Sequence, residues 1–335
     1  MSNIARDANR ATIYDVAREA NVSKSLVSLV LQGDERVSDQ RRKAVLKAID
    51  KLGYRPSRAA KLLAGNSSKS IGVVIDSYSN LWFVGILEGI RKVFDAAGYQ
   101  ITVSDLHRVG AGIEDPVDAF QALHVDGIVI ATEPDFLRDR VYDFPAVLVG
   151  DREREIPSID HVTSDDTMGG YMAARHLIEK GHTVIGHITG IGGTAAKRQL
   201  GYERAMHQAK LKPVVVGEGK ATDEKTGFEG ARDLLAQHPG LTAIFAANDY
   251  MAAGAFAYLR QAGKRVPEDI SLIGHDNSPT ASKYNLNLTT VAYDDDAIGT
   301  RSAELLLARI ENPEVKVERE VIEPVLIVRG TTRQI

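Results

Sequence analysis

Two short helical patterns separated by a tight turn near the N-terminus constrain this 335-residue chain more than any other feature. Apolar residues recur at helical spacing in residues 12–20 and again in residues 23–31, and Asn21 and Val22 lie between the two patterns. This spacing predicts a helix-turn-helix, an arrangement in which the second helix enters the major groove of DNA. We therefore expect the rest of the chain to control that small head.

Polar residues at the expected starts of the helices support this interpretation. Thr12 and Asp15 have the spacing of a capping box, in which two side chains satisfy the free backbone N–H groups of the first turn. Ser23 can cap the second helix, and Ser38 can cap a third amphipathic helix over residues 39–52. Three short helices around one small core are sufficient for a module that rests on DNA.

The charge of the chain is unevenly distributed. Residues 1–70 carry 14 Lys+Arg and 7 Asp+Glu, a net charge of +7, whereas residues 71–335 carry 27 basic and 38 acidic residues, a net charge of −11. A basic head on an acidic body is typical of a protein that contacts phosphate with one end only. The alternative is that these lysines and arginines merely solvate helix surfaces, but the charge coincides with the helix-turn-helix pattern. We expect the DNA-binding head to occupy residues 1–54.

Composition excludes several other classes of protein. The chain contains no cysteine, which rules out disulfides, thiol catalysis and cysteine-bound zinc. It has no run of eighteen apolar residues that would predict a membrane span, and residues 1–10 lack the apolar core of a signal peptide. The nine histidines show no metal-binding spacing, and no Ser-His-Asp order stands out. We therefore expect a cytoplasmic protein that uses no metal and no cofactor and is not an enzyme.

A miniature helical pattern over residues 55–65 follows the head. Pro56 restricts its entry, Ser57 can cap it, and Gly65 suits its end. The helical part, about seven residues, is well below the roughly 12–15 residues that give marginal stability in water. We expect residues 55–69 to act as a hinge and linker whose helix is ordered only when something packs on it, such as the same helix of a partner chain lying on DNA.

From residue 70 onward, apolar runs of strand length alternate with amphipathic helical patterns. Strands are expected at residues 71–75, 99–103, 127–130, 146–149, 184–188, 214–216, 243–245, 271–273 and 325–328. This alternation predicts an α/β body of two doubly wound parallel-sheet subdomains behind the all-α head. Ligands of such sheets bind beyond the carboxyl ends of the strands, so a cleft between the two subdomains is expected to hold a small molecule.

Several segments together resemble the lactose-repressor/purine-repressor (LacI/GalR) family of bacterial transcription regulators. They are TIYDVAREANVSKSLVSLVL, VSDQRRKAVLKAIDKLGYRPSRAAKLLAG, SIGVVI, VDGIVI, KRQLGY, AIFAANDYMAAGA, DISLIGHDN and LTTVAYD. The resemblance implies a periplasmic-binding-protein-like body with two discontinuous effector subdomains. These are residues 70–163 with 292–321, and residues 164–291 with 322–335.

The resemblance also assigns DNA contacts residue by residue. It places Lys24, Ser25 and Leu29 at base edges, and Tyr14, Ser23, Ser28, Gln32, Arg36, Ser38 and Arg41 on the DNA backbone. Leu63 matches the hinge leucine that wedges into the minor groove, with Ala60 packing beside it. Leu29 departs from the family, in which this position is often polar or basic. A leucine there can touch a thymine methyl but cannot pair with guanine, and packing between helices is an equal alternative.

Effector contacts follow from the same resemblance. Arg198, Asn248 and Asp276 match polar ligand contacts, and Asp151 is a further candidate. Trp82 and Phe83 are expected in the loop after the first strand, stacking on the ligand or walling it, with burial in the core as the alternative. Carboxylate and amide oxygens accept hydrogen bonds and a guanidinium donates them, which suits the neighbouring hydroxyls of a sugar or polyol better than a purine.

Other features near these positions leave alternatives open. Asp249 is expected to cap the helix that starts near Tyr250, and Asp276 is equally compatible with a turn. Thr222 departs from the family, in which an aromatic residue is common at this position, so the ligand is expected to be smaller, more polar or differently oriented.

Two other classes of function compete with this interpretation. Residues 190–195, Gly-Ile-Gly-Gly-Thr-Ala, fit the G-x-G-x-x-A fingerprint of dinucleotide-binding proteins, which would indicate an NAD-linked oxidoreductase. The motif is weak alone, and it precedes the helix that the family uses for effector contact. A sugar-binding protein of the periplasm would share the two-lobed body, but it would need a signal peptide and would not need a basic head.

The combined features predict a regulator that works by linkage. Two chains pair through their bodies and place two heads on an inverted-repeat operator, and an effector changes DNA affinity by its differential affinity for two arrangements of the lobes. The chain shows no leucine heptads after residues 325–328, so we expect a homodimer rather than a coiled-coil tetramer.

Overall fold

The computed structural model describes residues 11–31, 34, 36–54, 67–106, 115–132, 144–150, 156 and 158–335. The chain divides into two compact units, Met1–Lys69 and Ser70–Ile335. The predictions for Gln32, Ala60, Leu63 and Asp151, and for the short hinge helix over residues 55–65, lie outside the described residues.

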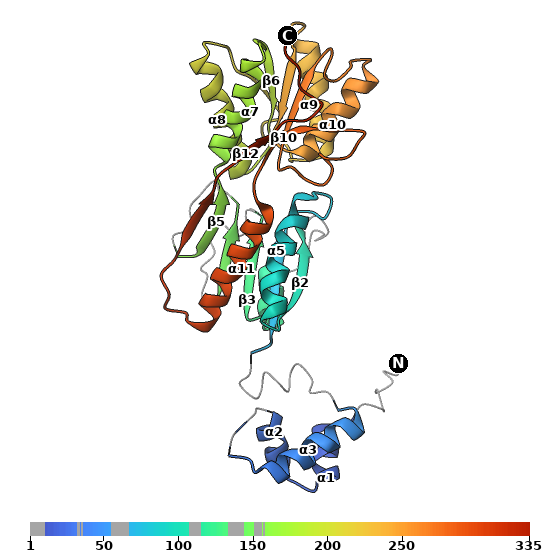
Figure 1. Ribbon diagram of the computed structural model, residues 1–335, viewed down its shortest axis with the longest axis vertical. Coiled ribbons are helices and arrows are strands. Elements are labelled where there is room, and N and C mark those ends of the chain that lie inside the picture. Colours follow the sequence, from blue (N-terminus) through green and yellow to red (C-terminus); the bar gives the residue numbers. More distant parts are fainter. Residues whose placement is uncertain are drawn as a thin grey trace, which may run out of the picture. The chain divides into compact units, whose positions relative to one another are not determined.

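The described part of the head unit consists of three helices, as predicted (Figure 1). They are α1 (Ile13–Glu19), α2 (Lys24–Leu31) and α3 (Asp39–Leu52). Each helix contributes a fully buried valine to one small core: Val16, Val27 and Val45. Burying such a side chain contributes roughly 1.5–3 kcal/mol, so each of the three helices depends on the other two.

The helix starts in the head agree with the sequence at two places and differ at a third. Thr12 forms the expected capping box, and the Ser23 hydroxyl accepts a hydrogen bond from the Leu26 N–H at 3.2 Å. Ser38 occupies the N-cap position of α3 as predicted, but its side chain makes no capping hydrogen bond. The preceding loop is held differently: the Arg42 guanidinium donates to the Asp34 carbonyl at 2.6 Å.

The first lobe of the body is a parallel sheet covered on both faces. Its strand order is β11 (Arg319–Ile322), β5 (Asp160–Ser164), β4 (Ala146–Val149), β3 (Gly127–Ala131), β1 (Ser70–Ile75) and β2 (Gln100–Asp105). Helices α5 (Trp82–Ala96) and α11 (Asp295–Glu311) pack on the face that Ile71 and Val73 present, and α6 (Pro116–Ala122) packs on the face of Val74. β1 is buried on both faces, and after Ser70 its sequence is accordingly an uninterrupted run of residues without polar side chains.

The second lobe repeats this design. Its strand order is β12 (Val325–Ile327), β10 (Thr289–Ala292), β9 (Ser271–His275), β8 (Ala243–Ala246), β6 (Ile185–Ile188) and β7 (Val214–Val216). Only β12 runs antiparallel to its neighbour among these described pairs. Helices α7 (Asp166–Glu179) and α8 (Gly193–Gln208) cover one face, and α9 (Glu224–Gln237) and α10 (Asp249–Gln261) cover the other. The expected doubly wound body is therefore confirmed.

Within residues 158–335 the chain crosses between the lobes three times (Figure 1). The crossings follow β5 at Ser164, β10 at Ala292 and β11 at Ile322. Side chains beside these crossings therefore lie where the two lobes meet. A hinge between the lobes must lie at the crossings. None of the helices in the described segments combines the length and apolarity that a membrane crossing requires.

Candidate functional site

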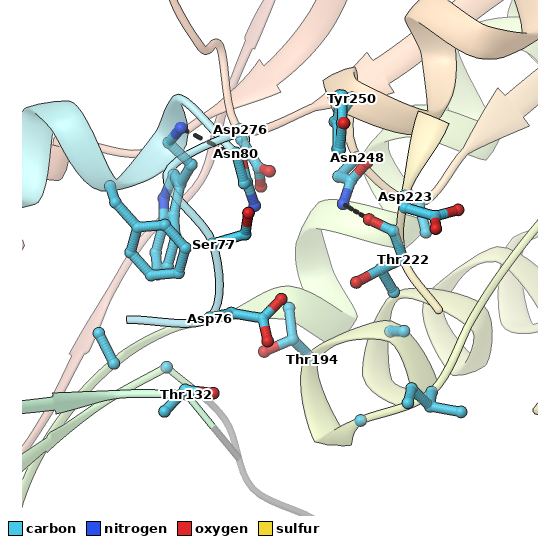
Figure 2. A pocket seen from close by; sticks show the side chains of 18 of the residues that line it. Asp76, Ser77, Asn80, Thr132, Thr194, Thr222, Asp223, Asn248, Tyr250 and Asp276 are labelled. Atoms are coloured by element: carbon cyan, nitrogen blue, oxygen red, sulfur yellow. Dashed lines mark hydrogen bonds between the residues drawn. The ribbon is translucent and has the colours of Figure 1, made fainter. Parts of the chain in front are cut away.

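A cavity of about 620 Å³ lies between the two lobes, at the carboxyl ends of their strands. The first lobe lines it with residues that include Asp76, Ser77, Asn80 and Thr132, and the second lobe with Thr194, Thr222, Asn248 and Asp276 (Figure 2). Its size is that of a pocket for a small molecule, and its walls carry many groups that can exchange hydrogen bonds with hydroxyls. The structure thus brings five of the predicted effector residues to one pocket: Trp82, Phe83, Arg198, Asn248 and Asp276.

Arg198 is the centre of the buried polar groups in this pocket. Its guanidinium donates from Nε to Asp166 Oδ1 at 2.7 Å and from Nη1 to the Ala247 carbonyl at 2.7 Å, and Nη2 lies 2.9 Å from Asp276 Oδ1. Burial lowers the pKa of Arg198, but Asp276 and Asp166 raise it by more, so the guanidinium remains charged. A guanidinium carries five N–H donors, more than these three contacts use.

Asp276 holds an unusual backbone conformation at the pocket. Its φ of +98° lies in a region that side-chain-bearing residues rarely adopt, and Asn277 follows at +48°. Such strain persists only where the surroundings fix it, and it is frequent at functional sites. Burial raises the pKa of Asp276 to about 6, although Arg198 opposes this rise.

Asn248, rather than Asp249, caps α10, so the capping role predicted for Asp249 was wrong. Asn248 has an extended backbone, and its Oδ1 accepts a hydrogen bond from the Met251 N–H at 2.7 Å. Its Nδ2 donates to the Thr222 carbonyl at 3.3 Å (Figure 2). Asn248 therefore fixes both the start of a helix and the neighbouring loop at Thr222, which also lines the pocket.

Asp249 is already helical, and its carboxylate turns into the lobe instead. It accepts hydrogen bonds from the Ser278 N–H and from the Thr290 hydroxyl, both at 2.7 Å. It thereby anchors the turn that presents Asp276. Burial raises the pKa of Asp249 to about 7, with the neighbouring Asp276 as the second cause.

The two aromatic residues occupy the start of α5 and not a loop, which corrects their predicted placement. The ring of Trp82 lies 4.9 Å from that of Phe83, and its indole N–H donates to Asp295 Oδ1 at 3.0 Å. Phe83 is only 4% exposed and belongs to the core of the first lobe while also lining the pocket. Phe83 therefore both lines the pocket and packs in the core, so the two alternatives given for it in the sequence analysis do not exclude each other.

Four side chains around the pocket were missed by the sequence analysis, namely Asp166, His275, Tyr293 and Asp295, and Asp249 was assigned only a capping role. Asp166 and Asp295 each open a helix directly after an aspartate that caps it. In the sequence such pairs indicate only a helix start. Nothing in the local pattern shows that the second aspartate of each pair turns inward.

The glycine-rich segment over residues 190–195 forms the entry to α8. The helix starts at Gly193, after Gly192 with a φ of +100°, and the loop lines the pocket. A side chain at Gly190 would collide with Thr222, because a Cβ there would lie 2.6 Å from Thr222 Cγ2.

Among the described residues, no cluster of three or more His, Asp and Glu side chains is arranged to hold a metal ion.

The predicted DNA-contacting residues of the head form a mostly exposed set. Tyr14, Ser23, Lys24, Ser25, Arg36, Ser38 and Arg41 are exposed, whereas Ser28 and Leu29 are half-buried. Lys24 Nζ lies 5.3 Å from the centre of the Tyr14 ring, which joins the first helix to the start of the second. Leu29 packs against the core of the head, so its packing alternative has structural support.

Comparisons with known proteins match both units. Residues 12–57 match the family model for bacterial regulatory proteins of the lacI family, and residues 174–332 match the periplasmic binding protein-like domain. The chain is 33% identical over 336 residues to the HTH-type transcriptional repressor PurR of Vibrio campbellii, a match that covers 97% of this chain and 99% of the relative.

Solved structures agree with these sequence matches. The lac repressor dimer bound to operator and the anti-inducer ONPF is similar with a TM-score of 0.81 at 28% identity, covering 97% of this chain and 99% of that one. A LacI family regulator from Enterococcus faecium with bound ribose has a TM-score of 0.71 at 26% identity, covering 79% of this chain and 99% of that one.

The Asp295 carboxyl predicts how the free energy of unfolding depends on pH. Burial raises its pKa from an ordinary 3.8 to about 8, with Asp276 as the second cause. Between these values the unfolded chain releases a proton that the folded chain retains, so the free energy of unfolding falls as the pH rises from about 4 to about 8. In Asp295→Asn this fall should be shallower, and the amide oxygen can still accept from Trp82. Urea denaturation between pH 5 and pH 8.5 measures it.

The matched control is Asp296→Asn, which removes a carboxylate from the same helical turn. Asp296 is 46% exposed and pairs with Lys92 at 2.6 Å. This control should keep the slope of the wild type. Equal slopes in Asp295→Asn and the wild type would show that Asp295 is ionised throughout this pH range.

Proposed function

Because this chain belongs to the lacI family of bacterial regulatory proteins, we propose that it is a sequence-specific transcriptional repressor whose hold on an operator is set by a small polar effector. One observation carries the proposal: a basic helix-turn-helix head and a polar cavity between two lobes occur in one chain. We place its action in the cytoplasm, where its DNA target lies.

The two alternative functions lose their support. The relatives of this chain are transcriptional repressors rather than enzymes, so the chain is not an NAD-linked oxidoreductase, and residues 190–195 instead open α8 at the pocket. A pure sugar-binding protein would not need a lacI-type head, which is matched over residues 12–57.

We assign operator reading to α2 and the surfaces beside it. Lys24, Ser25 and Leu29 are proposed to contact base edges. The proposed contacts to the DNA backbone and minor groove are Tyr14, Ser23, Ser28, Gln32, Arg36, Ser38, Arg41, Ala60 and Leu63. Exposure of Lys24 and Ser25 at the first turn of α2 supports this assignment, since the start of a recognition helix is the part that meets base edges.

We assign effector binding to the pocket between the lobes. Trp82, Phe83, Asp151, Arg198, Asn248 and Asp276 are the proposed contacts, and a sugar or polyol is the proposed ligand class. Bound ribose in the Enterococcus faecium relative supports this class. Two copies of the chain are proposed to act together, as in the lac repressor dimer on its operator, with inverted half-sites that mirror the two-fold axis.

A charge-matched pair of variants tests the DNA assignment. Lys24→Ala should weaken binding to an inverted-repeat operator by about 1–3 kcal/mol and relax its sequence preference, because a base-edge contact is lost. Fluorescence anisotropy with labelled duplexes at a fixed salt concentration measures both. Lys47→Ala removes the same charge from an exposed position of α3 and should leave the sequence preference intact. If the two variants had the same operator affinity and the same sequence preference, Lys24 would not contact base edges.

A second pair tests the effector assignment. Arg198→Lys keeps the charge, but a lysine ammonium cannot reproduce the planar guanidinium that contacts Asp166, Asp276 and the Ala247 carbonyl together. Effector affinity should therefore fall roughly tenfold or more. Trp82 is the only tryptophan of the chain and lines the pocket, so its emission reports binding directly. Suitable ligands for the titration are D-ribose and myo-inositol, with hypoxanthine as the purine for comparison.

The control for this pair is Arg309→Lys. Arg309 also pairs with a buried aspartate, Asp160, at 2.9 Å, but it lies in the first lobe and outside the pocket lining. It should retain wild-type effector affinity. Retained affinity in Arg198→Lys would refute the role of Arg198, and binding of hypoxanthine in place of the sugars would refute the ligand class.

A further inference from the structure

Five buried side chains form a closed ring of polar contacts that joins the pocket to the lobe crossings. Its members are Arg198, Asp166, Tyr293, His275 and Asp276. Arg198, Asp166 and Asp276 line the pocket, whereas Tyr293 and His275 are absent from its lining. Asp166 follows the first crossing, and Tyr293 lies on the second, between β10 and α11. The ring therefore touches two crossings and the ligand cavity at once.

The links of the ring are polar contacts of 2.7 to 3.3 Å. Arg198 binds Asp166 at 2.7 Å and Asp276 at 2.9 Å. The Tyr293 hydroxyl lies 3.3 Å from Asp166 Oδ1 and 3.3 Å from His275 Nε2. His275 Nδ1 lies 3.2 Å from Asp276 Oδ1, which closes the ring.

Within the ring, the hydroxyl proton of Tyr293 has two possible acceptors, and the Ser164 side chain also interacts with this hydroxyl. Burial lowers the pKa of His275 well below its ordinary value, so the imidazole is neutral and offers one donor and one acceptor nitrogen. Burial also raises the pKa of Tyr293 above its ordinary value, so its hydroxyl keeps its proton. With His275 Nδ1–H donating to Asp276, the Tyr293 hydroxyl can donate either to Asp166 or to His275. These are two discrete arrangements of the same groups.

A glycine brings a helix of the second lobe against this pair. A Cβ at Gly169 in α7 would lie 2.5 Å from His275 Nε2 and 2.7 Å from the Tyr293 hydroxyl oxygen. Only a hydrogen atom fits there, so α7 rests directly on the Tyr293–His275 contact. A shift of α7 at the first crossing must then disturb that contact.

We propose that Tyr293 and His275 are positioning residues that couple occupancy of the pocket to the arrangement of the lobe crossings. The inference rests on the proposed function. A ligand that hydrogen-bonds to Arg198 or Asp276 changes the pull of Asp166 and His275 on the Tyr293 proton. The favoured arrangement of the ring, and with it the first and second crossings, then changes. Coupling of this kind needs an element with two discrete states whose balance is changed both by the pocket and by the lobe crossings. In this proposal the ring of polar contacts is that element.

The experiment compares Tyr293→Phe with Tyr202→Phe. Tyr202 is another buried tyrosine whose hydroxyl donates to the Ile185 carbonyl at 2.8 Å and accepts from the Val214 N–H at 2.8 Å, and this hydroxyl makes no contact with the five residues of the polar ring among the hydrogen bonds of the described residues. Trp82 emission gives the dissociation constant for D-ribose or myo-inositol. Fluorescence anisotropy gives operator affinity with and without that ligand at saturation.

The expected result separates binding from coupling. In the wild type the ligand should change operator affinity by a factor of roughly 5–150. In Tyr293→Phe the ligand dissociation constant should stay within about threefold of wild type while this factor falls close to one. Tyr202→Phe should keep the wild-type factor. A wild-type factor in Tyr293→Phe would overturn the inference, as would an equal loss in both variants, because both results indicate a merely structural role.

A second arm needs no ligand. Amide hydrogen exchange of the unliganded protein should rise roughly fivefold or more at residues 165–168 and 292–295 in Tyr293→Phe and stay unchanged there in Tyr202→Phe. Unchanged exchange in Tyr293→Phe contradicts the inference. A wild-type protein whose operator affinity ignores every ligand that alters Trp82 emission would instead refute the proposed function, so the two failures are distinct.

Discussion

The buried ion pairs of Arg198 with Asp166 and Asp276 are the interaction on which the working part of this protein depends. The guanidinium is 6% exposed, and the carboxylates are 1% and 5% exposed. Breaking such a set by removing one partner typically costs about 3–5 kcal/mol, because the remaining charge is left buried and unpaired. Through these contacts one side chain holds the start of α7, the strained turn after β9 and, at the Ala247 carbonyl, the end of β8. The pocket exists in this shape because these three pieces of backbone meet at one cation.

Doubly wound sheets explain why the pocket lies where the lobes meet. Parallel strands deliver their carboxyl ends to one edge of each sheet, and in this chain the edges of both sheets supply lining residues to the same cavity. Ser164 at the first crossing lines that cavity, and Tyr293 at the second contacts Asp166 in its wall, so a ligand that bridges the lobes acts close to the segments about which the lobes must move. Binding energy spent there can shift the balance between arrangements of the body. The basic head needs no ligand contact of its own to respond.

Sequence reasoning predicted the architecture well because periodicity, caps and charge are local signals. The three helices of the head and the alternation of strands and helices in the body could be read from the sequence, but β5, β10 and β11 were not among the expected strands. Individual side chains at the site were harder. Asn248 and Asp249 are adjacent, and only the extended backbone at Asn248 determines which of them caps α10. His275 and Tyr293 gave no signal, because their contacts join residues 18 and 127 positions apart in the sequence, and such juxtapositions are set by the packing of the sheet.

Reciprocal linkage tests the central claim most directly. If one equilibrium between lobe arrangements connects pocket and operator, the factor by which a saturating ligand changes operator affinity must equal the factor by which saturating operator changes ligand affinity. Both can be measured on the wild-type protein in one buffer, the first by anisotropy of labelled operator and the second by Trp82 emission. The account predicts two equal factors, both different from one. A ligand that binds at the pocket with the same affinity whether or not operator is bound would contradict it.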